Sequence, residues 1–246
     1  MTERVDVALV SGGQDSTAAA AKAATETDLD MLVYLDTGTG AQANREYVET
    51  IADHLGLQLW TLRTHERYSD MVHEHGFPGS GVHHICYTKL KERQISKLAT
   101  VTTGELHLWT GVRRRESDRR MTTVEPEQDG GRWTWQAPLS EWSKEAVRQY
   151  IADNDLPESE LWETLGRSAD CWCGAYGSPE ELLDAEAAGL DDVTDQIRAL
   201  ESAVDRDEAK GRWAWAGMSD VQQRAERAEG NNMQLCSKCW SAPPDQ

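Results

Sequence analysis

The sequence predicts an α/β fold: a doubly wound, mostly parallel sheet followed by an acidic helical lobe. Short apolar runs alternate with helical stretches over about the first 150 residues, which is typical of such sheets. From Pro179 onward the chain is rich in Ala, Asp and Glu and has a helical pattern. At 246 residues, 39 % of them apolar, the chain can bury a core. We expect one domain over residues 1–176 and the helical lobe over residues 177–246.

Each element is predicted from its own stretch of sequence. An apolar run from Val5 to Val10 indicates the first strand, and an alanine-rich helix follows it to about Ala24. Further strands are expected at 31–35, 57–62, 106–112 and within 132–139, and further helices at 44–55 and within 141–157. Polar segments at 11–17, 36–38 and 111–120 follow strands. We therefore expect them to meet at the carboxyl edge of the sheet, where such sheets bind ligands.

The composition is strongly acidic, with a net charge of −18. Only seven of the 25 basic residues are Lys, and the chain has one Phe and five Ile, which indicates a protein adapted to a high-salt cytosol. An ordinary acidic protein is the alternative. No stretch approaches the ~20 apolar residues of a membrane span, and the N-terminus runs directly into a strand. We expect a cytoplasmic protein with no signal peptide and no membrane contact.

Arginines gather in a segment that carries no net charge. Residues 101–150 are neutral overall, whereas residues 151–246 carry −13. Because guanidinium groups bind anions, the segment indicates an anionic ligand near Arg113, Arg114, Arg115, Arg119 and Arg120. For Arg114, Arg115 and Arg119, a solvated basic edge that pairs with the acidic surface is the alternative. Nucleic-acid binding through charge alone is not expected of so acidic a chain.

The segment SGGQDST, from Ser11 to Thr17, follows a strand and opens a helix. Its glycines allow a tight turn in which backbone N–H groups approach a ligand, and the helix start adds unpaired donors and the positive end of the dipole. These features indicate a phosphate site formed by Ser11, Gly12, Gly13, Asp15, Ser16 and Thr17. The alternative is a Gly-Gly turn in which Asp15 or Ser16 caps the helix.

Six motifs in order along residues 5–175 resemble the phosphoadenosine phosphosulfate (PAPS) reductase family of the PP-loop ATP pyrophosphatase superfamily. The SGGxDS loop resembles the PP-loop, and Asp36-Thr37-Gly38 with Glu49-Thr50 resembles the second-strand motif of the family. The other matches are CYTKLK from Cys86, TGVRRRESDRR from Thr110, APLSEW from Ala137 and GRSADCWCG from Gly166. Each motif is weak by itself, but six in family order are specific.

The resemblance implies an adenine nucleotide, namely PAPS, adenosine phosphosulfate (APS) or ATP, along the carboxyl edge of the sheet. The loop would hold the phosphates, with Asp36 and Gly111 nearby. Arg113 and Arg120 would clamp the sulfate or terminal phosphates, and Lys89 or Lys91 would join them. With ATP as the substrate, Mg²⁺ on Asp15 or Asp36 is implied. The candidate catalytic residues are Asp15, Arg113, Arg120 and Cys86.

The cysteines indicate metal or redox chemistry, because disulfides are disfavoured in the cytosol. Cys171 and Cys173 form a CxC, and Cys236 and Cys239 form a CxxC. Four thiolates suit zinc or a 4Fe–4S cluster, while buried or free thiols are the alternative. Some relatives hold a 4Fe–4S cluster near the Cys86-like and Cys171-like positions. They have adjacent cysteines and a CxxC, where this chain has Cys86 alone and a CxC.

Three functions remain open at this point. The first is sulfur transfer or sulfonucleotide reduction with a thiol electron donor, which the arginine motif favours. The second is an ATP pyrophosphatase that adenylylates a nucleic acid or small molecule for sulfur insertion. The absence of the reductases' C-terminal Glu-Cys-Gly…His motif favours it, since no His follows His107. Reduction would then need Cys86, which has His83 and His84 beside it, or a C-terminal cysteine as nucleophile. The third is a non-catalytic nucleotide sensor.

Overall fold

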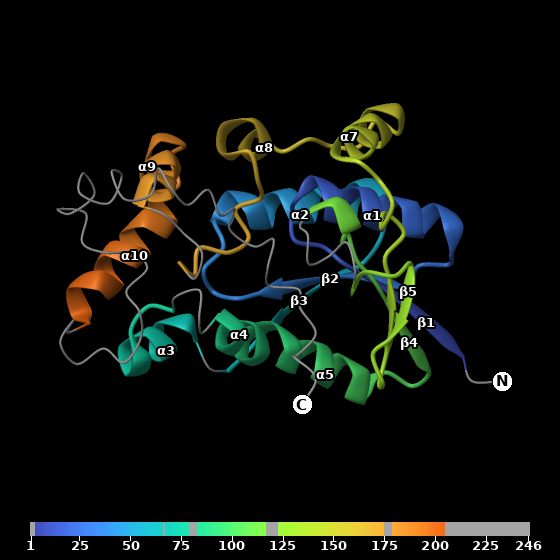
Figure 1. The fold of residues 1–246 in the computed structure, drawn as a ribbon, viewed down its shortest axis with the longest axis horizontal. Coiled ribbons are helices and arrows are strands. Elements are labelled where there is room, and N and C mark those ends of the chain that lie inside the picture. The colour runs from blue at the N-terminus through green and yellow to red at the C-terminus, as the bar shows by residue number, and fades with distance from the viewer. Residues whose placement is uncertain (1–2, 66, 79–82, 117–122, 175–178, 205–246) are drawn as a thin grey trace.

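A six-stranded sheet runs through the protein in the order β3-β2-β1-β4-β6-β5 (Figure 1). The structure is a computed structural model that describes residues 3–65, 67–78, 83–116, 123–174 and 179–204. The strands are β1 (Arg4–Leu9), β2 (Met31–Asp36), β3 (Leu59–Arg63), β4 (Glu105–Trp109), β5 (Glu127–Asp129) and β6 (Thr134–Gln136). All neighbouring strands are parallel except β5 and β6. This confirms the predicted mostly parallel α/β sheet.

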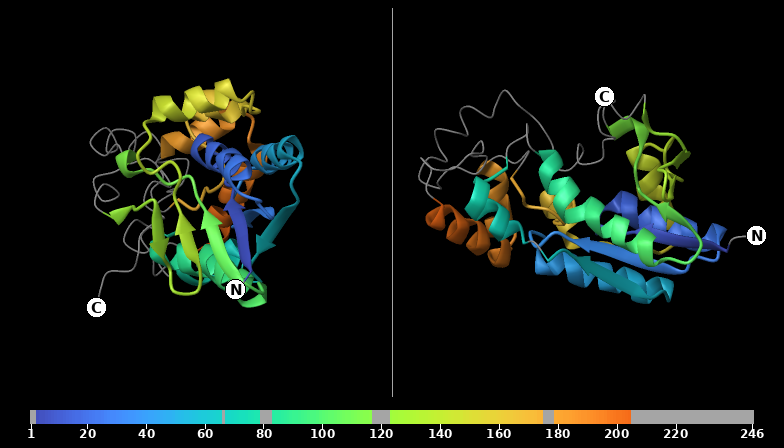
Figure 2. Two further views of the ribbon diagram at one scale, coloured as in Figure 1. Left: turned by 90° about the vertical axis from the view of Figure 1, so that its right-hand side faces the viewer. Right: turned by 90° about the horizontal axis from the view of Figure 1, so that it is seen from below.

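Helices cover both faces of the sheet (Figures 1 and 2). On one face lie α1 (Gln14–Glu26), α2 (Gln42–Leu55) and α7 (Lys144–Asp153), and on the other lies α5 (Arg93–Val101). Successive side chains of a strand point to opposite faces. Ala8 and Trp109 therefore join the core beneath α1 and α2, whereas Val7 and Leu108 join the core beside α5. The sheet is doubly wound, as its sequence predicts.

The strand order fixes where a ligand can bind. From β1 the chain moves outward through β2 to β3, and it then returns to the other side of β1 with β4. Parallel α/β sheets bind ligands at the carboxyl ends of the two strands that flank such a reversal. The loops that follow β1 and β4 contain the SGGQDST and arginine motifs, so the fold places both motifs at this position.

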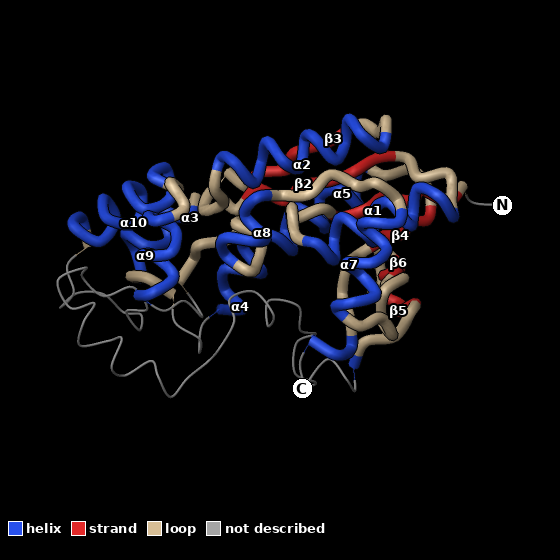
Figure 3. The backbone as a smooth tube through the Cα atoms, turned by 90° about the horizontal axis from the view of Figure 1, so that it is seen from above, coloured by secondary structure: helices blue, strands red, loops and turns tan. Residues whose placement is uncertain are grey.

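The described part of the acidic lobe is helical, as expected. It consists of α9 (Pro179–Ala187) and α10 (Asp191–Ala203), which group with α3 (Tyr68–His75) at the end of the molecule away from the N-terminus (Figure 3). Leu182 and Ile197 belong to the same buried cluster as Val72 and Trp172. The lobe therefore shares a core with the first 176 residues, and the domain boundary at residue 176 stays a prediction. Residues 205–246, with Cys236 and Cys239, lie outside the described residues.

One contact ties the lobe to the sheet domain. The carboxylate of Asp192 in α10 accepts a hydrogen bond of 2.7 Å from the backbone N–H of Gln42, the first residue of α2. Helix α2 has no side-chain cap of its own. Asp192 therefore satisfies a donor at the start of α2 and places negative charge at the positive end of its dipole.

The short elements differ most from expectation. The sequence did not indicate α3, α4 (His83–Cys86), the π-helical segment Tyr87–Glu92 or α8 (Glu160–Leu165). Elements of four to eight residues are too short for apolar periodicity to show. The exposed edge strand β5 carries no apolar residue and was also missed. None of the described helices is long and apolar enough to cross a membrane.

A buried carboxylate joins β1 to β4 and gives a stability prediction. Asp6 accepts hydrogen bonds from the Arg4 guanidinium at 2.6 Å and from the Trp109 indole N–H at 2.6 Å. Burial acts to raise the pKa of Asp6, but these hydrogen bonds outweigh it and hold the pKa below its usual value. The ionised group therefore stabilises the fold above the unfolded pKa of about 3.9, and this stabilisation is lost as pH falls through the lower folded pKa.

Asp6→Asn is expected to lower the free energy of unfolding by about 1–3 kcal/mol at pH 7, because hydrogen bonds to a charged acceptor become neutral ones. The difference from the unsubstituted protein is expected to shrink as the pH falls below about 4. Urea unfolding across this pH range measures both effects. A difference that stays constant with pH would show that the charge of Asp6 contributes nothing.

Candidate nucleotide site

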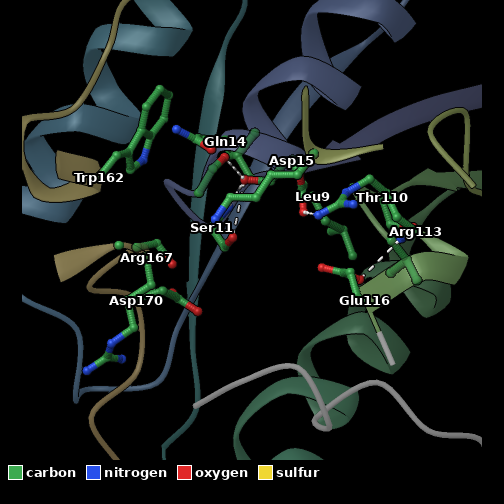
Figure 4. A pocket seen from close by; sticks show the side chains of 18 of the residues that line it. Leu9, Ser11, Gln14, Asp15, Thr110, Arg113, Glu116, Trp162, Arg167 and Asp170 are labelled. Atoms are coloured by element: carbon green, nitrogen blue, oxygen red, sulfur yellow. Dashed lines mark hydrogen bonds and ion pairs between the residues drawn. The ribbon is translucent and has the colours of Figure 1, made fainter. Parts of the chain in front are cut away.

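A cavity of about 810 Å³ opens at the carboxyl ends of β1 and β4. Its walls come from the loop after β1, the loop after β4, the π-helical segment, the start of α7 and the stretch 165–170 (Figure 4). The volume lies within the range of about 300–1,000 Å³ that small-molecule sites occupy. Apolar side chains line one part of it, from Leu9, Leu35, Tyr87 and Ile95. Val10, Val112, Trp162 and Leu165 add further apolar surface, and many of the other lining residues are polar or charged, so the cavity can hold a ligand with an apolar part and an anionic part.

The SGGQDST loop presents the start of α1 to this cavity. Ser11, Gly13, Asp15 and Ser16 all line it, as does Gln14. No side chain caps α1 at Gly13, and the first N–H groups of a helix have no acceptor within the helix. The hydroxyl of Ser16 instead binds inside the loop, accepting from Ser11 N at 3.1 Å and donating to Gly13 O at 3.0 Å. The N–H groups at the start of α1 therefore have no side-chain cap, and the residues that carry them line the cavity.

Gly111 brings the two loops together. A Cβ at this position would lie 2.4 Å from the backbone carbon of Asp15 and 2.5 Å from the nitrogen of Ser16. A side chain is excluded there, because real Cβ atoms do not approach backbone so closely. Gly111 therefore contributes by letting the arginine motif lie against the start of α1.

Arg113 is the buried cation of the site. Its residue is 7 % exposed, and its Nη2 lies 3.0 Å from Asp15 Oδ2, so an arginine after β4 pairs with an acid of the loop after β1. Its Nε is buried with no hydrogen-bond partner among the described residues. Glu116 accepts from the backbone N–H of Arg113 at 3.2 Å, and Figure 4 shows its carboxylate on the same side of the cavity. A guanidinium group with an unused donor beside a helix start suits an anion.

A second, partly buried ion pair lies on another wall of the cavity. Lys91 Nζ lies 2.9 Å from Asp170 Oδ2, and both residues line the cavity. Burial raises the pKa of Asp170, while Lys91 opposes that shift. The other oxygen, Oδ1, is buried with no hydrogen-bond partner among the described residues. Lys91 thus lines the cavity, and its ammonium group is paired with the carboxylate of Asp170.

The comparisons with known proteins are consistent with this geometry. The sequence model of a family described as "phosphoadenosine phosphosulfate reductase domain" matches residues 6–173, more than half of the chain. The chain belongs to the PAPS reductase domain family. The matched range covers both loops and the stretch that contains Asp170. No curated protein matches the chain in sequence.

Solved structures resemble this PAPS reductase-family chain at low identity. The PAPS reductase of Candida auris, in a phosphate complex, has 14 % identity and a TM-score of 0.49, over 66 % of this chain and 78 % of its own. The FMN adenylyltransferase of Candida glabrata, with FAD and inorganic pyrophosphate, has 12 % identity and a TM-score of 0.48, over 65 % of this chain and 52 % of its own. This chain thus matches about half of that protein. Yeast FAD synthetase in complex with FAD has 12 % identity and a TM-score of 0.44, over 93 % and 74 % of the two chains.

The remaining arginines of the family motif separate into three groups. Arg115 lines the cavity. Arg114 instead binds away from it, with Nη2 2.7 Å from Glu125 and an ion pair to Glu141. Arg119 lies outside the described residues, and so does Arg120, which was expected to be the second anion clamp.

Other predicted site residues lie away from the cavity lining. Asp36 is 1 % exposed and its carboxylate accepts from the Gly38 N–H at 2.7 Å and from Arg63, so it holds the turn after β2. The hydroxyl of Thr17 lies 3.2 Å from that of Tyr47 and faces α2. Gly12 lies against Asn44 of α2, because a Cβ at Gly12 would be 2.3 Å from Oδ1 of Asn44. These three residues shape the site, and their expected direct contact with a nucleotide stays a prediction.

Three thiols meet in the buried cluster beside the lobe. Cys173 is in hydrogen-bond contact with Cys171 and Cys86, and these contacts together with burial raise the pKa of Cys173. All three residues are buried, and none lines the cavity. No three His, Cys, Asp or Glu side chains in the described ranges have the arrangement of a metal site. These thiols therefore form no complete donor set among the described residues.

Sequence reasoning did not single out several residues of the cavity wall, among them Trp162, Arg167 and Lys144. Lys144 lies in the helix expected within 141–157, Arg167 lies in a family motif, and the stretch around Trp162 was not assigned a structure. Arg167 lies with its Cζ 4.1 Å from the centre of the Trp172 ring and pairs with Glu181 at 3.3 Å. The family motif GRSADCWCG contained this arginine, which was the available signal.

Proposed function

We propose that this PAPS reductase-family chain binds an adenine nucleotide in the cavity and acts on it as an enzyme of sulfur metabolism, by sulfonucleotide reduction or sulfur transfer. One observation carries the proposal: the uncapped start of α1 and the buried Arg113 face one cavity at the reversal of strand order. Backbone N–H donors and a guanidinium group together suit a phosphate or sulfate group. The apolar side chains of Leu9, Leu35 and Ile95 suit a purine ring.

The residues of the site have distinct roles in this proposal. The N–H groups at the start of α1 hold phosphate oxygens, and Arg113 neutralises the sulfate or terminal phosphate. Binding of that anion competes with Asp15 for Arg113, because the two are paired at 3.0 Å. Catalysis then consists mainly of positioning and of charge neutralisation as the bond to the leaving group breaks. In reduction, a thiol donor supplies two electrons to the sulfonucleotide, and sulfite leaves.

The second candidate is attack on the α-phosphate of ATP with release of pyrophosphate, which activates an acceptor by adenylylation. The specific observation in its favour is that no cysteine lines the cavity in the described part of the chain. Reduction needs a sulfur nucleophile at the bound sulfate, whereas adenylylation does not. Mg²⁺ belongs to this route, with Asp15 as its candidate ligand. Asp36 fits less well, because its carboxylate is occupied by Gly38 and Arg63.

One pair of assays separates these functions. The protein is incubated with PAPS or APS and a thiol donor, and sulfite is measured; it is separately incubated with ATP and Mg²⁺, and pyrophosphate is measured. Sulfite alone supports reduction, and pyrophosphate alone supports adenylylation. Neither product, with nucleotide bound, indicates a nucleotide sensor. No binding of any of the three nucleotides would contradict the proposal.

We also propose that the thiols of Cys171 and Cys173 bind zinc or a 4Fe–4S cluster together with Cys236 and Cys239. Support comes from the contact of Cys173 with Cys171 in one buried cluster, to which Cys236 and Cys239 would add the remaining thiolates. Such a group would tie the lobe to the sheet domain and stabilise both. The anaerobically purified protein is expected to contain about one zinc or about four irons per chain, and Cys171→Ser is expected to lose most of it. Equal metal content in both proteins would contradict this assignment.

A further inference from the structure

Three carbonyl groups of the SGGQDST loop, those of Ser11, Gly12 and Gly13, each accept a hydrogen bond from within the protein. Gly13 O accepts from Ser16 Oγ at 3.0 Å and from the N–H of Thr17 at 3.0 Å. Ser11 O accepts from Asn44 Nδ2 at 3.1 Å. Gly12 O accepts from the indole N–H of Trp162 at 2.8 Å. A loop that binds an anion needs its carbonyl oxygens held by donors of the protein, because a free carbonyl oxygen turned into the site would repel the anion.

Two of these four donors, Asn44 and Trp162, come from outside the loop. Asn44 lies in α2 and is 1 % exposed; Trp162 lies in α8, 150 residues away along the chain, and is 7 % exposed. Trp162 is wedged edge-on against Tyr47 of α2, with ring centres 5.2 Å apart and planes at 77°. Burial raises the pKa of Tyr47, so its hydroxyl stays protonated and donates to Pro157 O at 2.8 Å. The indole ring of Trp162 is therefore held both by its packing against Tyr47 and by the hydrogen bond of its N–H to Gly12 O.

We infer that Trp162, assisted by Asn44, is a positioning residue of the proposed phosphate site: its indole N–H holds the Gly12 carbonyl away from the cavity and so keeps the loop donors aimed at the ligand. Trp162 also lines the cavity (Figure 4). The inference rests on the proposed phosphate-binding function. It assigns to α8 a role that no motif in the sequence indicated.

Trp162→Phe tests the role of the N–H, because it keeps an aromatic ring against Tyr47 and removes the donor. Trp142→Phe is the matched control. The ring of Trp142 lies edge-on to Tyr150 at 5.3 Å, outside the cavity lining, and its N–H binds nothing in the described residues. The dissociation constant for inorganic pyrophosphate and that for adenosine are measured by calorimetry for each protein, with urea unfolding to compare stability.

Trp162→Phe is expected to weaken pyrophosphate binding about three- to tenfold, the effect of one buried hydrogen bond, and to leave adenosine binding unchanged. Trp142→Phe is expected to leave the dissociation constants of both ligands unchanged.

The inference would be overturned if the Trp162→Phe variant bound pyrophosphate as tightly as the unsubstituted protein. It would also be overturned if this variant lost the same factor of affinity for pyrophosphate and for adenosine. If the Trp162→Phe variant does not fold, the Asn44→Asp variant is used to test the inference. This substitution places a carboxylate oxygen against Ser11 O and is expected to weaken pyrophosphate binding by a similar factor. Unchanged pyrophosphate binding in the Asn44→Asp variant would overturn the inference. An unsubstituted protein that binds no pyrophosphate would instead remove the proposed function itself.

Discussion

Arg113→Gln is expected to weaken pyrophosphate and nucleotide binding about 100-fold. The substitution removes charge-assisted hydrogen bonds worth about 1.5–3 kcal/mol each, and a factor of 100 corresponds to about 2.7 kcal/mol. It also leaves Asp15 without its partner at 3.0 Å, so a negative charge then faces the bound anion. Both effects act against binding, and isothermal titration with pyrophosphate and ATP measures their sum.

The neighbouring Arg114 provides the matched control. Its guanidinium group pairs with Glu125 and Glu141 and lies outside the cavity lining. Arg114→Gln removes the same charge from the next position in the chain and is expected to change nucleotide affinity less than about twofold, because exposed ion pairs contribute about 0–1 kcal/mol. Equal losses in the two variants would mean that general electrostatic attraction, and not a site at Arg113, binds the anion.

Gly12→Ala is expected to abolish measurable nucleotide binding and to lower stability. Gly12 has φ +78°, and a Cβ there would lie 2.3 Å from Oδ1 of Asn44. The backbone conformation alone costs about 1–3 kcal/mol for a residue other than glycine. The clash adds to this, because Asn44 must move, and it then releases the Ser11 carbonyl that it holds at 3.1 Å.

Gly131→Ala separates the clash from the backbone strain. Gly131 has a similar φ of +82°, but a Cβ there would meet nothing within 4 Å. Both variants carry the strain, and only Gly12→Ala displaces Asn44. We expect Gly131→Ala to lower stability by about 1–2 kcal/mol and to bind pyrophosphate normally. Loss of binding in both proteins would point to global destabilisation and against a specific role of the loop.

Much of the sheet and of its ligand edge could be predicted because its signals are local. An apolar strand, a glycine pair and an alanine-rich helix lie next to each other in residues 5–24, so β1, the loop and α1 follow from neighbouring residues. The four alanines Ala18–Ala21 are buried and let α1 lie close to the sheet. The resemblance of six motifs to the PAPS reductase family supplied the order of the rest.

The site residues that escaped prediction depend on contacts between distant segments. Nothing near Trp162 shows that its N–H reaches the carbonyl of Gly12, 150 residues earlier. Asp36 was expected near the nucleotide, and nothing in the local sequence shows that its carboxylate binds Arg63, at the end of the next strand; its contact with a nucleotide stays a prediction. Cys86 was expected to be a nucleophile because two histidines lie beside it, and its contact with Cys173 becomes visible only when α4 and the stretch 168–173 are packed together. Its catalytic role stays a prediction.

A crystal structure of the protein with a bound adenine nucleotide tests the central claim most directly. We predict phosphate or sulfate oxygens about 2.7–3.2 Å from the backbone N–H groups at the start of α1 and from the guanidinium group of Arg113. The purine is predicted to lie against Leu35 and Ile95. A nucleotide whose anionic groups lie away from residues 11–16, with Arg113 still paired to Asp15, would contradict the account.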